Sequence, residues 1–107
     1  MKKVYIAHAL SGAWDEGVKA AKEYAFRAAT IGCMPIVPYA LMDGLLDDTI
    51  EDERNLGMQL DIRQLINCDE IWLCGERISE GMEKEREIAA LLHIPEKRFR
   101  FLHRVGA

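Results

Sequence analysis

The chain is predicted to adopt an α/β fold in which helices cover both faces of a short parallel sheet. Three short apolar runs without polar alternation begin near residues 3, 35 and 69, and such runs are typical of strands buried on both faces. Between them lie segments with apolar residues at helical spacing. Strands that alternate with helices in this way form a parallel sheet with right-handed crossovers.

The expected elements follow one another without a linker or an internal repeat. Strands are predicted at residues 3–7, 35–38, 69–74 and 98–105, and helices at 15–31, at 50–67 and over a segment that includes 82–92. The first strand is expected at the centre of the sheet. Pro95 should break the chain before the last strand, whose basic residues suit an edge.

The predicted helices carry apolar faces that would pack on the sheet. This face consists of Val18, Ala21, Ala25, Ala28 and Ala29 in the first helix, and of Met58, Ile62, Leu65 and Ile66 in the second. Asp61 stands beside the second stripe, which places a carboxylate near an apolar face. Leu56 and Leu60 lie about half a turn away, so this helix has more apolar surface than one sheet face can bury.

Residues 39–49 form a long connection that mixes apolar and acidic residues. Loops of this length in a compact domain often cover a binding site. A solvated loop packed by Leu41 and Leu45 fits the sequence equally well.

Composition and charge indicate one soluble domain of residues 1–107. Half of the 107 residues are apolar and 30% are charged, which is ordinary for a globular protein. The formal net charge of −4 offers no basic surface to a nucleic-acid polymer, so binding to one is not expected.

No segment reaches membrane-spanning length, and His8 interrupts the first apolar run too early for a signal peptide. Cys33, Cys68 and Cys74 lie in apolar contexts without C-x-x-C spacing, so reduced, buried thiols in a cytoplasmic protein are expected. The three histidines are scattered, and neither a metal nor a cofactor is expected.

Glu85 is the main candidate for a functional residue. On a helical wheel that starts at Met82, the apolar residues Ile88, Ala89, Leu91 and Leu92 fall on one arc, and Glu85 lies in the middle of it. The neighbouring charges of the helix fall on the other face or its border. A carboxylate on an apolar face costs several kcal/mol unless it is paired, hydrogen-bonded or exposed in a cleft.

Two explanations for Glu85 remain open. Ligands of open α/β sheets bind beyond the carboxyl ends of the strands, where the helix of Glu85 begins, and a helix N-terminus favours an anion. A carboxylate facing such a cleft and ionised at pH 7 would suit a nucleophile or a base. Alternatively, Glu85 is a structural residue bonded to neighbouring backbone or to an arginine.

The first strand is followed by a loop in which Gly12 would let backbone amides approach a ligand. As a phosphate-binding signal the loop is weak, because it matches neither a Walker loop nor G-x-G-x-x-G, and a plain strand-to-helix turn fits as well.

Several local motifs together resemble the nucleoside 2-deoxyribosyltransferase-like superfamily over about residues 3–95. They are V-Y-I-A followed by S-G, D-I-R-Q-L-I-N-C-D before a strand, and S-E-G-M-E-K-E with Ala89 four residues further on. The resemblance implies a flavodoxin-like three-layer sandwich. It also implies transfer or hydrolysis of the N-glycosidic bond of deoxynucleosides or their 5'-monophosphates, without a cofactor.

The resemblance gives roles to particular residues. Glu85 matches the catalytic glutamate that attacks the anomeric carbon, Asp61 resembles an aspartate on the base side that acts as an acid, and Tyr5 resembles an aromatic residue near the glutamate. The candidate substrate contacts are His8, Ser11 and Gly12 of the first loop, Ser79, Gly81 and Met82 before and within the last helix, and Arg54.

Two departures from the superfamily pattern shape the expected substrate. Ser79 stands where the transferases carry an aspartate, which resembles the 2'-deoxynucleoside 5'-phosphate N-hydrolases and favours a nucleotide over a nucleoside. His8, Ala9 and Leu10 replace a glycine-rich or arginine-bearing loop. The run D-D-x-x-x-x-E-R and the run G-x-R-I-S-x-G-M resemble most an uncharacterised, often phage-associated branch.

Three classes of function follow for this chain. The first is an enzyme that acts on a deoxyribonucleotide or deoxyribonucleoside, the second a module of the same fold that binds a nucleotide, and the third a structural assembly protein. Because members of the superfamily commonly complete each other's sites, the resemblance also implies a homodimer or higher homo-oligomer that buries Leu56 or Leu60.

Overall fold

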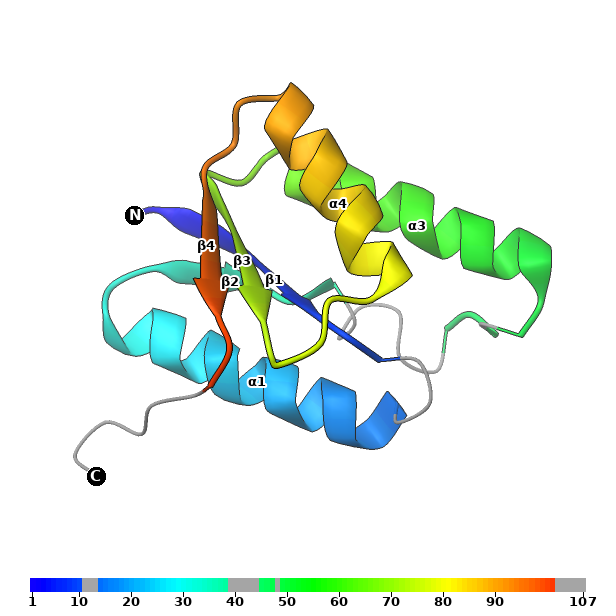
Figure 1. The fold of residues 1–107 in the computed structure, drawn as a ribbon, viewed down its shortest axis with the longest axis horizontal. Coiled ribbons are helices and arrows are strands. Elements are labelled where there is room, and N and C mark those ends of the chain that lie inside the picture. The colour runs from blue at the N-terminus through cyan, green and yellow to red at the C-terminus, as the bar shows by residue number, and fades with distance from the viewer. Residues whose placement is uncertain (11–13, 39–44, 48, 102–107) are drawn as a thin grey trace.

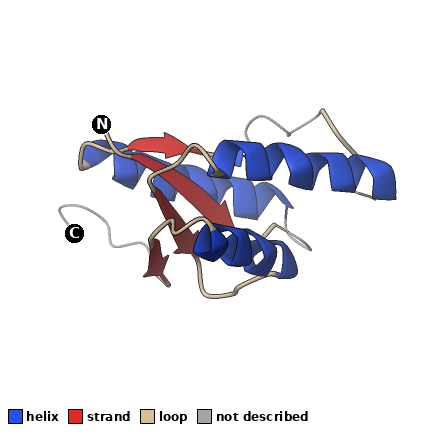
Figure 2. Cartoon of the chain, turned by 90° about the horizontal axis from the view of Figure 1, so that it is seen from above, coloured by secondary structure: helices blue, strands red, loops and turns tan. Residues whose placement is uncertain are grey.

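The computed structural model describes residues 1–10, 14–38, 45–47 and 49–101, and within them the α/β prediction is confirmed. The elements are β1 (Lys3–His8), α1 (Trp14–Thr30), β2 (Met34–Ile36), α3 (Glu51–Leu65), β3 (Glu70–Cys74), α4 (Glu80–Leu91) and β4 (Glu96–Phe99). The four strands are all parallel, in the order β2-β1-β3-β4, so β1 is an inner strand as expected (Figure 1). The strands twist relative to one another, as parallel strands do (Figure 2).

Two strand predictions are wrong in their bounds. Pro35 lies inside β2 and not at its end, which is tolerated because β2 is an edge strand. The last strand occupies Glu96–Phe99 and not residues 98–105. It begins directly after Pro95, whose carbonyl accepts the N–H of Ile71, and it ends where Phe99 pairs with the last residue of β3. Residues 102–105 lie outside the described part of the chain.

Side chains alternate along the strands and build one core on each face of the sheet. On the α1 face lie Val4, Ile6, Trp72 and Cys74, packed against Val18, Ala21, Tyr24, Ala25 and Ala28. On the α3 and α4 face lie Tyr5, Ala7, Ile71 and Leu73, packed against Leu65, Cys68, Met82 and Ala89. Ala29, predicted on the face of α1 that packs on the sheet, is exposed.

The predicted core stripe of α3 is largely wrong, because this helix packs on α4 and extends past the end of the sheet (Figures 1 and 2). Leu65 is its one buried residue among those described, Met58 and Ile62 are half-buried, and Ile66 is 49% exposed. Similarly, Leu91 and Leu92 leave the apolar arc because α4 ends there, and both are exposed.

The cysteines agree in part with the prediction. All three are free, Cys68 and Cys74 are buried, and Cys33 is half-buried. Burial raises the pKa of the Cys68 thiol to about 11 and that of Cys74 to about 12, so neither is a thiolate at neutral pH. None of the described helices is both long and apolar enough to cross a membrane.

Candidate functional site

Tyr5 and Glu85 meet in the layer between the sheet and the helices α3 and α4. Tyr5 lies in the middle of β1 and is fully buried, and Glu85, in the second turn of α4, is only 4% exposed. The Tyr5 hydroxyl donates a hydrogen bond to Oε2 of Glu85. The wheel therefore identified the inward-facing carboxyl correctly, and the structure adds its hydroxyl partner.

Burial changes the ionisation of Glu85. Loss of solvent raises its pKa from the ordinary 4.5 to about 8, the hydrogen bond from Tyr5 opposes this rise, and the charge of Asp61 adds to it. At pH 7 the protonated form therefore predominates. The prediction that this carboxyl is ionised at pH 7 is wrong for this structure, because desolvation outweighs the hydrogen bond from Tyr5.

Asp61 brings a second carboxyl to the same layer from α3. It is half-buried, and burial raises its pKa from the ordinary 3.8 to about 7. Its Oδ1 atom is buried without a hydrogen-bond partner in the described part of the chain, as is Nε2 of Gln64 one turn later. An unsatisfied buried polar atom costs about 1–3 kcal/mol, and a ligand group that supplied the missing hydrogen bond would recover this free energy. Sequence reasoning missed Gln64. It lies three residues after Asp61, a spacing that places both side chains on the same face of a helix.

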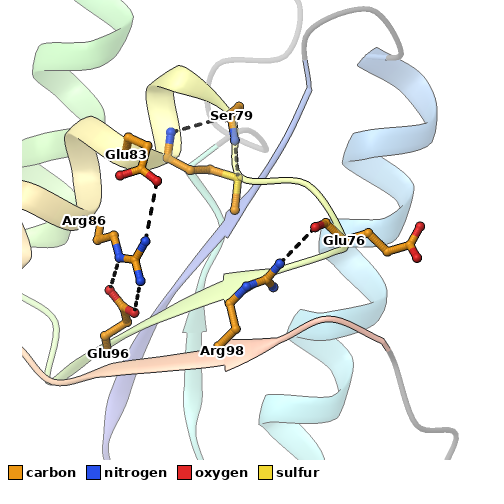
Figure 3. Close-up of polar contacts among 7 residues, drawn as sticks. Glu76, Ser79, Glu83, Arg86, Glu96 and Arg98 are labelled. Carbon is orange, nitrogen blue, oxygen red and sulfur yellow. Dashed lines mark hydrogen bonds and ion pairs between the residues drawn. The ribbon is translucent and has the colours of Figure 1, made fainter.

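Ser79 is the N-cap of α4, and its surroundings explain why the helix starts there. Its Oγ accepts the Met82 N–H at 3.2 Å, while its own N–H donates to Met82 Sδ at 3.4 Å (Figure 3). Met82, predicted as a substrate contact, is buried in the core under this cap. Gly81 is half-buried, and an added Cβ would meet Met58 at an ordinary 3.7 Å.

The remaining predicted contacts are dispersed. His8 ends β1 half-buried, with its ring against Gly75, where φ is +93° and an added Cβ would lie 2.8 Å from Nε2. Arg54 is exposed in the first turn of α3, seven positions before Asp61. Ser11 and Gly12 lie outside the described residues. The structure therefore brings together Tyr5, Glu85 and Asp61, and it does not place Arg54 or Met82 as ligand contacts.

Glu70 is a second buried carboxylate, at the opposite end of the sheet from the start of α4. It accepts hydrogen bonds from Lys2 Nζ at 2.7 Å and Trp72 Nε1 at 3.0 Å, and Lys97 Nζ lies 3.4 Å away. Burial alone would raise its pKa, but the hydrogen bonds and charges of these partners outweigh burial and hold the pKa below its usual range. This carboxylate is thus ionised and structural. Sequence reasoning missed it because it opens an otherwise apolar strand.

No group of three or more potential metal ligands comes together within the described ranges. The chemistry available at the site is therefore that of two coupled carboxyls and a phenol: proton transfer, hydrogen bonding and nucleophilic attack by a carboxylate.

Comparisons with known proteins place this geometry in context. The family model described as Domain of unknown function (DUF7768) matches residues 2–99, and the chain therefore belongs to that family. No curated protein matches the chain. Among solved structures, the 2-deoxyribosyltransferase of the psychrotolerant bacterium Bacillus psychrosaccharolyticus is similar at a TM-score of 0.73 and 15% identity, over 96% of this chain and 77% of that one. At this identity the likeness shows the fold, and the flavodoxin-like prediction is confirmed.

The raised pKa values predict that stability falls as the pH rises. Folded Glu85 and Asp61 keep their protons up to about pH 8 and 7, whereas the unfolded chain releases them near 4.5 and 3.8. Between these values the folded state binds more protons, so its stability is greatest below this window and declines through it. We expect the free energy of unfolding, measured by urea denaturation, to drop by about 4–6 kcal/mol from pH 5 to pH 8.

Glu85→Gln should remove most of this slope, and Asp61→Asn part of it. Glu70→Gln is the matched control: it removes a buried carboxylate that is already ionised at pH 5, so the slope should persist on a less stable protein. An undiminished slope in both Glu85→Gln and Asp61→Asn would contradict the assignment.

Proposed function

We propose that this member of the DUF7768 family cleaves or transfers the N-glycosidic bond of a deoxyribonucleotide or deoxyribonucleoside, with Glu85 as the nucleophile. The observation that carries the proposal is the buried contact between Tyr5 and Glu85, with Asp61 coupled to the same carboxyl. This arrangement lies on a fold similar to that of a 2-deoxyribosyltransferase.

The proposed reaction follows from the three groups. Glu85 first loses its proton to solvent, and its carboxylate then attacks the anomeric carbon, forming a glycosyl ester as the bond to the base breaks. The transition state is oxocarbenium-like, so the adjacent anion stabilises it. Asp61 donates its proton to the departing base. The reactive form, with Glu85 ionised and Asp61 protonated, is the minor singly protonated form, because the pKa of Glu85 is the higher of the two. Water releases the sugar in hydrolysis, and a second base accepts it in transfer.

The second candidate is a nucleotide-binding module without chemistry. The observation that favours it is the protonation of Glu85 at neutral pH, because a neutral carboxyl both donates and accepts hydrogen bonds and could hold a sugar hydroxyl. Incubation with a panel of deoxynucleoside monophosphates separates the two. Release of free base, followed by chromatography, requires catalysis, whereas a thermal shift without release indicates the module.

Glu85→Gln should lower the turnover by at least about a hundredfold, or roughly 3 kcal/mol of barrier, since the amide cannot form the ester. The fold should persist, because the substitution replaces a buried neutral carboxyl with a neutral amide of the same shape. Glu87→Gln, the same change at an exposed position of α4, is the control and should retain activity. Comparable turnover in folded Glu85→Gln would rule out a nucleophile at this position.

We also propose that Ser79 contacts a 5'-phosphate beside the start of α4. Ser79→Asp keeps a good N-cap and adds a negative charge, so it should leave the melting temperature nearly unchanged. Monophosphate binding, measured by calorimetry, should weaken at least about tenfold, while nucleoside binding changes little. Ser79→Asn is the neutral, cap-preserving control. Equal weakening of both ligands by Ser79→Asp would argue against a phosphate contact.

A second copy of the chain is proposed to cover α3, where Leu56 is 44% exposed and Leu60 half-buried. Light scattering at micromolar concentration should then give at least twice the 12.2 kDa mass of one chain. Leu56→Asp should shift the protein to the monomer, whereas Leu91→Asp, an equally apolar and more exposed site at the far end of α4, should not. A monomeric wild type would refute the proposal.

A further inference from the structure

β4 presents two charged side chains to the layer that contains Glu85. In the parallel register Glu96 pairs with Ile71 and Arg98 with Leu73, and both partners belong to the core on the α3 and α4 face. Glu96 and Arg98 therefore project from the same face of the sheet edge, Glu96 toward Arg86 of α4 and Arg98 toward Glu76 in the loop before α4 (Figure 3).

Glu96 holds α4 through the residue next to Glu85. Arg86 donates from Nε to Oε1 of Glu96 at 2.7 Å and from Nη2 to Oε2 at 2.9 Å, a two-point fork, and its third nitrogen lies 3.5 Å from Glu83. Most partly exposed ion pairs contribute little to stability, but a bidentate arginine-carboxylate fork fixes geometry as well as distance. Consecutive residues of a helix point about 100° apart, so Arg86 held on the sheet edge fixes the roll that turns Glu85 toward Tyr5.

Arg98 holds the loop that leads into α4. Its Nη1 donates to the main-chain carbonyl of Leu73 at 3.0 Å, and its Nη2 donates to that of Glu76 at 3.1 Å. This loop contains Gly75, with φ of +93°, and continues to the N-cap Ser79. Arg98 thus ties the loop before the helix to the edge of the sheet, while Glu96 ties the middle of the helix.

From these contacts we infer that Glu96 and Arg98 of β4 are positioning residues: Glu96 clamps α4 through Arg86, Arg98 clamps the loop that leads into α4, and together they hold Glu85 against Tyr5. The inference rests on the proposed function only for its effect on a reaction; the geometric claim stands without it. Neither residue needs to touch a substrate.

Carboxyl-selective NMR of protein labelled at the glutamate Cδ tests the clamp independently of any activity. The Glu85 signal, assigned by its loss in Glu85→Gln, should titrate well above pH 4.5 in the wild type. In Glu96→Gln and in Arg98→Met its midpoint should fall by about one pH unit or more, because a loosened helix admits water to the carboxyl. Lys84→Met, which removes the exposed 3.9 Å pair with Glu80 on the same helix, is the matched control and should leave the titration unchanged.

In the base-release assay the two variants should lose about tenfold in kcat while KM stays within about twofold. A displaced Glu85 carboxylate lies too far from the anomeric carbon to react efficiently, whereas the contacts that bind the substrate are unchanged. Arg98→Lys keeps one donor and the charge and should recover part of the loss, and the exchange Arg86→Glu with Glu96→Arg should restore the pair. If Arg98→Met does not fold, Arg98→Lys and the exchanged pair still test the clamp.

An unchanged Glu85 titration in folded Glu96→Gln and Arg98→Met would overturn the inference, even if both lose stability. A wild type that releases no base would refute the proposed function instead, and the titration would still decide the clamp.

Discussion

The removal of the Glu85 carboxyl from water is the constraint on which this layer of the molecule depends. An ionised carboxyl at 4% exposure would cost several kcal/mol, and the structure lowers this cost in two ways. The Tyr5 hydroxyl supplies a hydrogen bond, and the proton stays on the carboxyl to about pH 8. Both effects require α4 to present Glu85 to the middle of β1. The protonation of this carboxyl therefore depends on how the helix packs on the sheet.

The buried carboxyl of Glu70 is stabilised in a different way, as an anion with paired cations and not as a protonated group. At 5% exposure it has nearly the burial of Glu85, yet two lysines and an indole N–H keep it ionised. Such a carboxylate is already paired within the structure. The pKa of Glu85 is instead set by burial, by the hydrogen bond from Tyr5 and by the charge of Asp61. The contrast between the two carboxyls, more than burial itself, is what distinguishes the candidate site from a structural ion pair.

Much of the fold follows from the sequence because local patterns specify it. Uninterrupted apolar strands separated by helical segments predicted the parallel sheet, and the wheel of α4 predicted that Glu85 faces inward. Sequence patterns gave the wrong burial or the wrong bounds where these depend on the element that packs against a segment. Ile66 and Leu92 have apolar side chains at the expected phase, but each lies at a helix end with too little surface opposite it. The length of β4 was likewise set by where β3 ends, which its own residues do not specify.

The candidate site was predictable in its residues and not in its electrostatics. Spacing alone placed Glu85 and Asp61 on inward or boundary positions, but the sign of a pKa shift depends on the balance of desolvation and partners across β1, α3 and α4. The contacts of β4 illustrate why. Its residues alternate between the two faces. Glu96 binds Arg86 of α4 and Arg98 binds the loop before α4, while Lys97 pairs with Glu70 and Phe99 packs at a tilt against Trp72. A slip of one residue in register would exchange these two sets of contacts. A four-residue edge strand therefore links the ionised carboxylate on one face to the protonated carboxyl on the other, and its register with β3 keeps both in place.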